Sequence, residues 1–457
     1  MKTKKLIAMV LTLVLAAAMF AGCGSETEQP AEEKPVAENV PAEPEENKDP
    51  LATTGEDVTI EFYSGYTGAD GNVVAEFVEQ YGKDHPNVHI NVTTLQFTSL
   101  FSKFMTDAAA GNIPDILMVH PQEQNAFVRL GLVDTEAVAR AGLKEEDYLP
   151  GPWKNSFING VQVGIPVDVG GLMLFANDDM LAEAGIDEIP TDGEGFIACM
   201  QKLTLDAKGN TADSPDFDPE NIVQYGMGFP STNHFAFYYW YSLIRQQGEE
   251  LTSDDGLSVA FSTEAGVKAA QLMQDFIYKY HICPAGQSAS FDDFYAKQTA
   301  TCVAGNWYIP QLNSAAPDFA VSSHVLPTFY DEDYYWGSGS HFVFPKTADG
   351  DINRQNEAIK FIKALSEWEG YPETGHIPAY KANAESARDL PYREALFEMM
   401  GEHQATLPDL PKSIQAYSAT APSAILSLGS DVLLNQADCA SAVETFQKAF
   451  GAILTQP

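Results

Sequence analysis

Residues 58–119 read VTIEFYSGYTGADGNVVAEFVEQYGKDHPNVHINVTTLQFTSLFSKFMTDAAAGNIPDILMV. Val58, Ile60 and Phe62 alternate with polar residues, which predicts a β-strand. Hydrophobic patterns also predict two further strands, over residues 88–92 and 116–119. Apolar residues at helical spacing predict two helices, over residues 73–81 and 100–108. Thr98 or Ser99 is the expected N-cap of the second helix. The order βαβαβ predicts an α/β fold with a parallel sheet and right-handed crossovers.

Three short segments follow these strands, at the edge where open α/β sheets bind their ligands. They are residues 63–66, 95–97 and 120–122, and they carry aromatic rings, amides and an imidazole. None of them contains a lysine, an arginine or a glycine-rich phosphate loop. The sequence therefore disfavours a nucleotide or a phosphorylated ligand at this edge.

The charge balance narrows the function further. The chain has 457 residues, with 26 Lys and Arg against 64 Asp and Glu, and a formal net charge of −38. Nucleic-acid binding and charge-driven binding to anionic lipids both need a basic face, so both are disfavoured. The length predicts two or three domains, and the 45% hydrophobic content is enough to build their cores.

The N-terminus has the features of a bacterial lipoprotein signal. Lys2, Lys4 and Lys5 precede an uncharged apolar run over residues 6–20, which is short for a membrane span. The sequence FAGC at residues 20–23 resembles a lipobox, with Phe20 in place of the usual leucine. We therefore expect a signal peptide over residues 1–22 and lipidation of Cys23; the alternative is a plain signal peptide with an incidental cysteine.

The segment that follows predicts a tether. Residues 24–57 hold eleven acidic residues, two lysines and five prolines, and almost no large apolar residue. Such a composition cannot bury a core, so a disordered acidic tether is expected over residues 23–57. The resulting localisation is the outer face of the cytoplasmic membrane, extracellular in a Gram-positive bacterium and otherwise periplasmic.

Two other features carry no clear chemical signal. The remaining cysteines form no C-x-x-C pair, and we expect buried free thiols at Cys199, Cys283, Cys302 and Cys439. Residues 206–220 are rich in Asp, Gly and Pro, and predict a surface loop. Its aspartates lack the EF-hand spacing, so Asx-turns are favoured over calcium binding and no metal site is predicted.

Several short motifs, in this order, resemble the family 1 extracellular solute-binding proteins of ABC transporters, the maltose-binding-like group. The resemblance runs from about residue 58 to the end of the chain. It is carried by motifs at residues 77–81, 85–88, 109–115, 131–134, 164–166, 183–186, 225–228, 261–264, 305–307, 326–327, 374–378 and 408–411. Each motif is weak alone, but their order behind a lipobox makes them specific together.

The resemblance implies a two-lobed periplasmic-binding-protein fold of type II, with a sheet flanked by helices in each lobe and a cleft between the lobes. Lobe 1 is then expected over residues 58–170 and 343–388, and lobe 2 over 171–342 and 389–457. The implied function is capture of a sugar or oligosaccharide by a monomer, without catalysis or a cofactor, and its delivery to the permease subunits of an importer. Hinge closure is the implied motion.

Sugars offer flat C–H faces for aromatic stacking and hydroxyls for hydrogen bonds. Trp307 and Asn306 lie in a motif where similar proteins place a stacking ring. Other candidate ligand-binding residues are chosen for their place at strand ends, crossovers or aromatic segments: Trp240, Phe235, Trp336, Asp168, Tyr63, Tyr66, Asp70, His120, His341, His376 and Tyr380. The resemblance adds Tyr417, at a position where similar proteins place an aromatic residue.

Alternatives stay open at this stage. The aromatic run at residues 234–241 is equally typical of a helix core, Asp70 could only cap a helix, and His120 could be structural. An acidic, aromatic cleft could also bind a peptide or a polyamine. A glycosidase is a further alternative, although no G-x-S-x-G or H-E-x-x-H motif is present and its two carboxylates cannot be identified by count.

Overall fold

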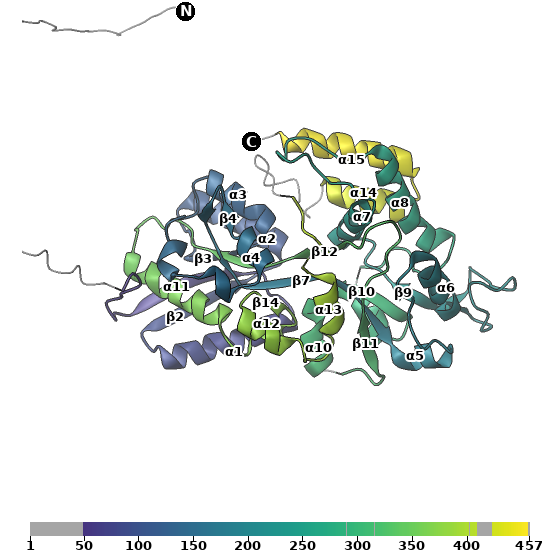
Figure 1. Ribbon diagram of the computed structural model, residues 1–457, viewed down its shortest axis with the longest axis horizontal. Helices are drawn as coiled ribbons and strands as arrows, with labels where there is room; N and C mark the ends of the chain where they lie inside the picture. Colours follow the sequence, from purple (N-terminus) through teal and green to yellow (C-terminus); the bar gives the residue numbers. More distant parts are fainter. Residues whose placement is uncertain (1–48, 289, 315, 402, 409–422, 456–457) are drawn as a thin grey trace, which may run out of the picture. The chain divides into compact units, whose positions relative to one another are not determined.

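The first sheet of the computed structural model has five strands in the order β2-β1-β3-β13-β6, and Figure 1 labels β2 and β3 of this sheet. The structure describes residues 49–455 except 289, 315, 402 and 409–422. The strands are β1 (Val58–Ser64), β2 (Val88–Thr94), β3 (Ile116–Val119), β13 (His341–Val343) and β6 (Ile165–Pro166). β1 pairs in parallel with β2 and β3, as predicted for these three strands, whereas β13 pairs antiparallel with β3 and β6 and makes the sheet mixed.

The helices that flank this sheet are α1 (Ala69–Asp84), α2 (Phe97–Ala110), α3 (Pro121–Arg129) and α11 (Ile352–Ser366). All four residues of β3 are buried, as its continuous apolar run predicts. The predicted cap of α2 is wrong: the helix begins at Phe97, and its N-cap is Gln96, whose side chain makes no capping hydrogen bond. Apolar residues of the sheet, α1 and α11 pack into one core, and β3 and α2 contribute to a second cluster.

The second sheet is eight-stranded and is built around β7 (Asp168–Asn177), which is buried along its whole length. Its main path is β15-β12-β7-β10-β9-β8, with β11 and β14 also paired to β7. The other strands are β8 (Leu205–Asp206), β9 (Ile222–Gly228), β10 (Thr299–Gly305), β11 (Val321–His324), β12 (Tyr335–Ser338), β14 (Ile377–Pro378) and β15 (Gln404–Ala405).

The helices of the second lobe are α5 (Asp178–Glu183), α6 (Gly193–Leu203), α7 (His234–Gln246), α8 (Thr263–Tyr278), α9 (Ser290–Tyr295), α10 (Ile309–Ser314), α13 (Glu394–Met399), α14 (Ala424–Leu433) and α15 (Cys439–Leu454). α8 is capped by Ser262, whose side chain accepts a hydrogen bond from the Ala265 N–H. The C-terminal region forms two helices, α14 and α15. Buried side chains of these helices and of the second sheet form the largest hydrophobic core.

Short elements complete the described chain. They are the helix α4 (Pro150–Asn155), the hairpin β4 (Phe157–Ile158) and β5 (Val161–Gln162), the helix α12 (Lys381–Ala387) and the 3-10 turns η1 (Val138–Ala141), η2 (Glu145–Asp147), η3 (Asn306–Tyr308) and η4 (Tyr371–Thr374). Within the described ranges, no helix combines the length and the apolar character needed to cross a membrane. The predicted signal peptide, Cys23 and most of the tether lie outside the described residues.

The chain passes from one sheet to the other at defined strands. β6 belongs to the first sheet and β7, two residues later, to the second; β12 and β13 return in the same way. Glycines allow close backbone contact here: a Cβ on Gly339 would lie 2.2 Å from the carbonyl oxygen of Asp168. These crossovers define two α/β lobes with a narrow, tightly packed hinge.

Two remaining predictions concern the polar loop and the cysteines. The four described cysteines are free and buried, as expected. The Asp206 carboxylate accepts hydrogen bonds from the backbone of Lys208 and Asn210 at 2.8 and 2.9 Å. Desolvation opposes ionisation, but the hydrogen bonds from Asn210 and its neighbours outweigh it and lower the pKa of Asp206 to about 2. Asx-turn bonding therefore occupies this carboxylate.

Candidate functional site

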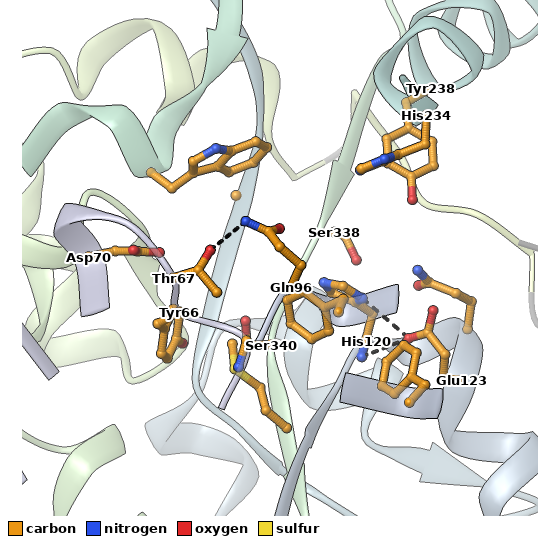
Figure 2. Close-up of a pocket in the computed structure, with 18 of the residues that line it drawn as sticks. Tyr66, Thr67, Asp70, Gln96, His120, Glu123, His234, Tyr238, Ser338 and Ser340 are labelled. Atoms are coloured by element: carbon orange, nitrogen blue, oxygen red, sulfur yellow. Dashed lines mark hydrogen bonds and ion pairs between the residues drawn. The ribbon is translucent and has the colours of Figure 1, made fainter. Parts of the chain in front are cut away.

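A cavity of about 930 Å³ lies where the ends of the first sheet meet α7, η3 and the hinge strands (Figure 2). Its walls include the β1–α1 loop, the start of α2 and the β3–α3 turn, the three segments that the sequence predicted as the ligand edge. The opposite wall comes from the second lobe. Ligand sites in proteins range over about 300–1,000 Å³, so this cavity has room for more than one sugar ring.

Two pairs of stacked aromatic rings line the second-lobe wall. Phe235 and Trp307 have ring centroids 5.3 Å apart and planes inclined by 27°. Tyr238 and Trp336 are closer, at 4.1 Å and 10°. Phe235 and Tyr238 are three residues apart on α7 and therefore share one face of that helix. The wall is thus lined by aromatic rings, of which Phe235 and Trp307 are partly exposed and Tyr238 and Trp336 are 8% and 6% exposed. Aromatic faces suit the C–H faces of sugar rings.

Several buried polar atoms in the lining have no hydrogen-bond partner among the described residues. They are Gln122 Oε1, Trp336 Nε1, Ser338 Oγ and His376 Nδ1. Each of these residues is less than 8% exposed. An unpaired buried polar group costs stability, so such atoms usually have a protein, water or ligand partner. They are four of the twelve such side-chain atoms found among the described residues, and they give the cavity wall capacity to bind a polar ligand.

The first-lobe wall is organised around His120 and Glu123. The Glu123 carboxylate accepts from the His120 backbone N–H at 2.9 Å and lies 3.2 Å from His120 Nδ1, forming the capping box of α3. The imidazole packs on the Phe97 ring, with centroids 3.9 Å apart. Figure 2 shows His234 and Tyr238 across the cavity from this pair. His120 is therefore fixed both as a helix cap and as a cavity residue.

Asp70 lies in the first turn of α1 and lines the cavity. Its Oδ1 accepts from the backbone N–H groups of Gly68 and Gly71 at 2.9 and 2.7 Å. Desolvation raises the pKa of Asp70, and His376 nearby opposes that rise. No hydrogen bond from the described residues reaches Oδ2, so this oxygen is available to a ligand. One carboxylate oxygen of Asp70 thus accepts hydrogen bonds from the backbone at the start of α1, and the other is available in the cavity.

Asp168 is at the hinge and is 1% exposed. Its Oδ2 accepts from the hydroxyls of Tyr66 and Tyr371 at 2.7 and 2.5 Å, and its Oδ1 from the Ser340 backbone N–H at 2.7 Å. Desolvation raises its pKa, but His376 and the hydroxyl donors outweigh this and lower the pKa of Asp168 below its ordinary value. Three protein donors leave little capacity for a ligand, so the carboxylate chiefly joins the hinge segments.

Charge on the lining is one-sided. Among the described residues, the lining contains Asp70, Glu123 and Asp168, but no lysine or arginine. Burial, with a smaller contribution from His120, lowers the pKa of His234 to about 4, so this imidazole is neutral at physiological pH. The described lining is therefore polar and acidic, and none of its residues offers a permanent positive charge to an anionic ligand.

The structure brings together eight of the predicted ligand-binding residues at this cavity: Trp307, Trp336, Phe235, Asp168, Tyr66, Asp70, His120 and His376. Tyr417 lies outside the described residues. The other five predicted ligand-binding residues do not line the cavity.

Trp240 is a core residue, 1% exposed, and its ring packs against Phe237, Phe261 and Phe446. Its indole N–H donates to the carbonyl oxygen of Gly266 at 3.1 Å. The residue lies on the opposite face of α7 from Phe235, because successive helix positions are rotated by about 100°. All of its surface and its one donor are used by the protein, which leaves nothing for a ligand.

The other four are held by protein partners. The Tyr63 hydroxyl donates to Asp107 at 2.5 Å, and Tyr380 packs edge-on against Tyr148. Asn306 is fully buried, and its amide accepts from the Gly171 N–H at 2.8 Å and donates to the Gly375 carbonyl oxygen at 3.1 Å. His341 is also fully buried, and its Nε2 donates to the carbonyl oxygen of Pro152 at 3.1 Å.

Some lining residues were not among the predicted site residues. Gln122 and Glu123 follow β3 directly, and Gln122 belongs to a predicted ligand-edge segment, so a signal for it existed. Ser338 and Tyr238 lie on elements distant in sequence, and only the folding of β12 and α7 beside each other brings them to the cavity. No local pattern marks a lone serine in a strand as a cavity residue.

Two α/β lobes, joined by crossing strands and enclosing a polar and aromatic cavity, define a solute-binding protein. A family profile described as bacterial extracellular solute-binding protein matches residues 76–387, more than half of the chain. The chain belongs to this family. A curated relative from Brucella abortus (strain 2308), whose name says only that it is a binding protein, is 22% identical over 59% of this chain. The match covers 62% of that protein, less than two thirds of its length.

Solved structures share the fold. An ABC substrate-binding protein from Listeria monocytogenes, in complex with cycloalternan, has a TM-score of 0.73 and 18% identity, over 88% of this chain and 100% of that one. A maltose/maltodextrin-binding domain from Bdellovibrio bacteriovorus, bound to maltotriose, has a TM-score of 0.72 and 18% identity over 86% and 99%. UgpB from Mycobacterium tuberculosis, in complex with glycerophosphocholine, has a TM-score of 0.72 and 17% identity, over 87% of this chain and 98% of that one.

Proposed function

We propose that this protein captures an oligosaccharide in the cavity and delivers it to the membrane permease of an ABC importer, without catalysing a reaction on it. The observation that carries the proposal is the pairing of stacked rings with unpartnered buried polar atoms. Phe235, Trp307, Tyr238 and Trp336 offer apolar faces, while Ser338 and its neighbours offer hydrogen bonds. A sugar is the common solute that presents both kinds of surface.

The similar structures support a sugar as the ligand, because two of them are complexes with cycloalternan and maltotriose. The third holds glycerophosphocholine, so the shared fold also accommodates other solutes. The cavity volume of about 930 Å³ favours an oligosaccharide over a monosaccharide. We also propose that the chain acts as a monomer, held at the outer face of the cytoplasmic membrane by a lipid on Cys23.

A second candidate is an amine-containing solute such as a polyamine or a peptide. The observation that favours it is the lining itself, where Asp70 and Glu123 have no lysine or arginine to balance them among the described residues. Aromatic faces beside carboxylates are a usual environment for an ammonium group. The two candidates predict different ligands, because an amine without hydroxyl groups would bind only if this second candidate is right.

A thermal-shift panel tests the proposal. Monosaccharides, oligosaccharides, polyamines and short peptides are each added to the purified protein. A ligand present at about 100 times its Kd raises the unfolding free energy by about 2.7 kcal/mol. We expect at least one oligosaccharide to do this and the matching monosaccharide to do less. If an amine or a peptide shifts the melting curve and no sugar does, the second candidate replaces the first.

The anchor is tested separately. We expect Cys23→Ser to release the protein into the medium or the periplasm, while the wild-type protein stays with the membrane fraction. Two or more acyl chains are needed for stable anchoring, so a mass increase of that size on the fragment containing Cys23 is the direct readout. Membrane retention of the serine variant would contradict lipid anchoring.

A further inference from the structure

We propose that Asp70 is a specificity residue, which makes the cavity reject sugars that carry a negative charge. The inference rests on the proposed capture of a carbohydrate and adds the charge class of the substrate: neutral or amino sugars bind, and uronic acids and sugar phosphates do not. It is independent of which sugar is bound, because it depends on the Asp70 charge and on a described lining that contains no lysine or arginine.

The carboxylate of Asp70 is held in place and directed at the cavity. The residue is 6% exposed, and two backbone N–H groups, from Gly68 and Gly71, fix its Oδ1. Desolvation raises the pKa of Asp70, and the two backbone donors oppose that rise because they favour the ionised carboxylate. The second oxygen has no hydrogen bond from the described residues, and Figure 2 shows the Asp70 carboxylate directed toward the space between the lining residues.

Nothing permanent in the described lining neutralises this charge. The described lining contains no lysine or arginine, and the ionisable groups whose charges act on Asp70 are His376 and Asp168. Glu123 adds a second carboxylate, whose Oε1 has no hydrogen bond from the described residues. Like charges in a space shielded from water repel each other strongly. A carboxylate or phosphate on the ligand would therefore meet two negative groups.

The unpartnered atoms point to the same class of ligand. Gln122 Oε1 is a carbonyl oxygen, buried and without a partner, and it can only accept a hydrogen bond. Together with Asp70 Oδ2 and Glu123 Oε1, it makes the lining rich in acceptors. Hydroxyl and ammonium groups donate to such atoms, whereas a carboxylate brings only further acceptors. The hydrogen-bonding pattern and the negative charge of the lining thus both favour neutral or amino sugars over acidic sugars.

The experiment uses matched trios of sugars built on maltose, cellobiose and mannobiose. Each trio has the neutral disaccharide, its C6 carboxylate and its 2-amino form, and binding is measured by titration calorimetry at neutral pH. For the wild-type protein we expect the carboxylate to bind at least about 100-fold more weakly than the neutral sugar of the same trio. The amino form is expected to bind as well as the neutral sugar or better.

Two variants locate the effect. Asp70→Asn removes the charge and keeps an oxygen for Gly68 and Gly71, and it should narrow the gap between neutral and acidic sugars at least tenfold. Asp187→Asn makes the same change of net charge at an exposed position outside the cavity lining, and it should leave the gap unchanged.

The outcomes separate the two proposals. If the neutral and acidic members bind the wild-type protein within about threefold of each other, the charge filter is wrong while carbohydrate capture stands. If the gap is present but unchanged in Asp70→Asn, Asp70 is not its source and the assignment is wrong. If no sugar in the thermal-shift panel and no member of any trio binds, carbohydrate capture fails and the charge filter fails with it. The comparison of neutral and acidic sugars on the wild-type protein needs no variant, so it tests the charge filter even if Asp70→Asn fails to fold.

Discussion

The two faces of α7 carry the same kinds of residue but have different environments. On one face, Trp240 packs among Phe237 and other rings of the second core, and its N–H is hydrogen-bonded to the protein. On the other face, Tyr238 stacks on Trp336, whose N–H is buried and has no partner in the described part of the chain. Unmet hydrogen-bonding capacity alone does not mark the binding face, because the Tyr239 hydroxyl on the same helix is also buried without a partner among the described residues and lies outside the lining. The cavity face is distinguished by unpartnered polar atoms that line the cavity, and aromatic content alone does not distinguish it.

The comparison makes a two-sided prediction for α7. Substitutions on the core face should lower the free energy of unfolding and leave the affinity of the folded protein intact. Substitutions on the cavity face should lower affinity and leave stability nearly intact. Four predictions test or refine this division.

Trp240→Ala should have the largest effect. Deleting a fully buried aromatic ring costs about 3–5 kcal/mol, because packing is lost and a cavity remains. The measurement is urea denaturation, with sugar affinity determined on the folded fraction. Trp240→Phe is the matched control, since it keeps a ring and should lose less. Weaker sugar binding by a fully stable Trp240→Ala protein would show that this face also contributes to the site.

The buried His341 gives a prediction for how the free energy of unfolding depends on pH. Burial lowers the pKa of His341 to about 4, whereas an unfolded histidine titrates near 6.5. The unfolded state therefore binds more protons below pH 6.5, and stability falls as the pH drops from 6.5 toward 4. The loss from this residue should reach about 3 kcal/mol below pH 4.

His341→Gln should make the decline in stability between pH 6.5 and 4 shallower, measured by denaturant unfolding at several pH values. His89→Gln is the control, because His89 is exposed on β2 and its replacement removes a histidine without removing a buried one. An identical pH dependence in His341→Gln and the wild type would contradict the assignment of this loss to His341.

Much of the fold followed from local patterns in the sequence. Alternating and helical spacings placed β1, α1, β2, α2 and β3, because these periodicities reflect which side faces the core. The start of α2 was misplaced, since Gln96 makes no side-chain capping bond and so leaves no sequence signal. Parallel-sheet geometry then placed the ligand edge, and residues from all three predicted edge segments line the cavity.

The site was harder to predict for a physical reason. Residues 234–241 are aromatic at nearly every position, so periodicity cannot show which face of α7 meets the cavity. That choice depends on β12 and η3, which lie some 70 to 100 residues away in sequence. Asp168 is similar: its hydroxyl partners are 102 and 203 residues away, so a hydroxyl-binding role and a hinge role could not be distinguished in advance.

Trp307→Ala should weaken the binding of the best oligosaccharide by about 2 kcal/mol, or roughly 30-fold, as expected for a central aromatic contact. Trp307 is only partly buried, so the free energy of unfolding without ligand should change less than in Trp240→Ala. Titration calorimetry and denaturation of the same samples check both parts. Trp307→Phe should retain part of the affinity, and unchanged affinity in the alanine variant would remove Trp307 from the site.

Ser338→Ala should have the smallest effect and is the sharpest test of the comparison. Its hydroxyl is buried without a partner in the described chain, so its removal should not destabilise the free protein. If the hydroxyl bonds the sugar, affinity should fall by about 1 kcal/mol, or roughly fivefold. Ser242→Ala is the matched control, because that hydroxyl already accepts from the Trp336 backbone N–H at 2.7 Å and donates to the Tyr238 carbonyl oxygen. Its loss should instead lower stability. The same change in both variants would mean that partner satisfaction does not separate site from core.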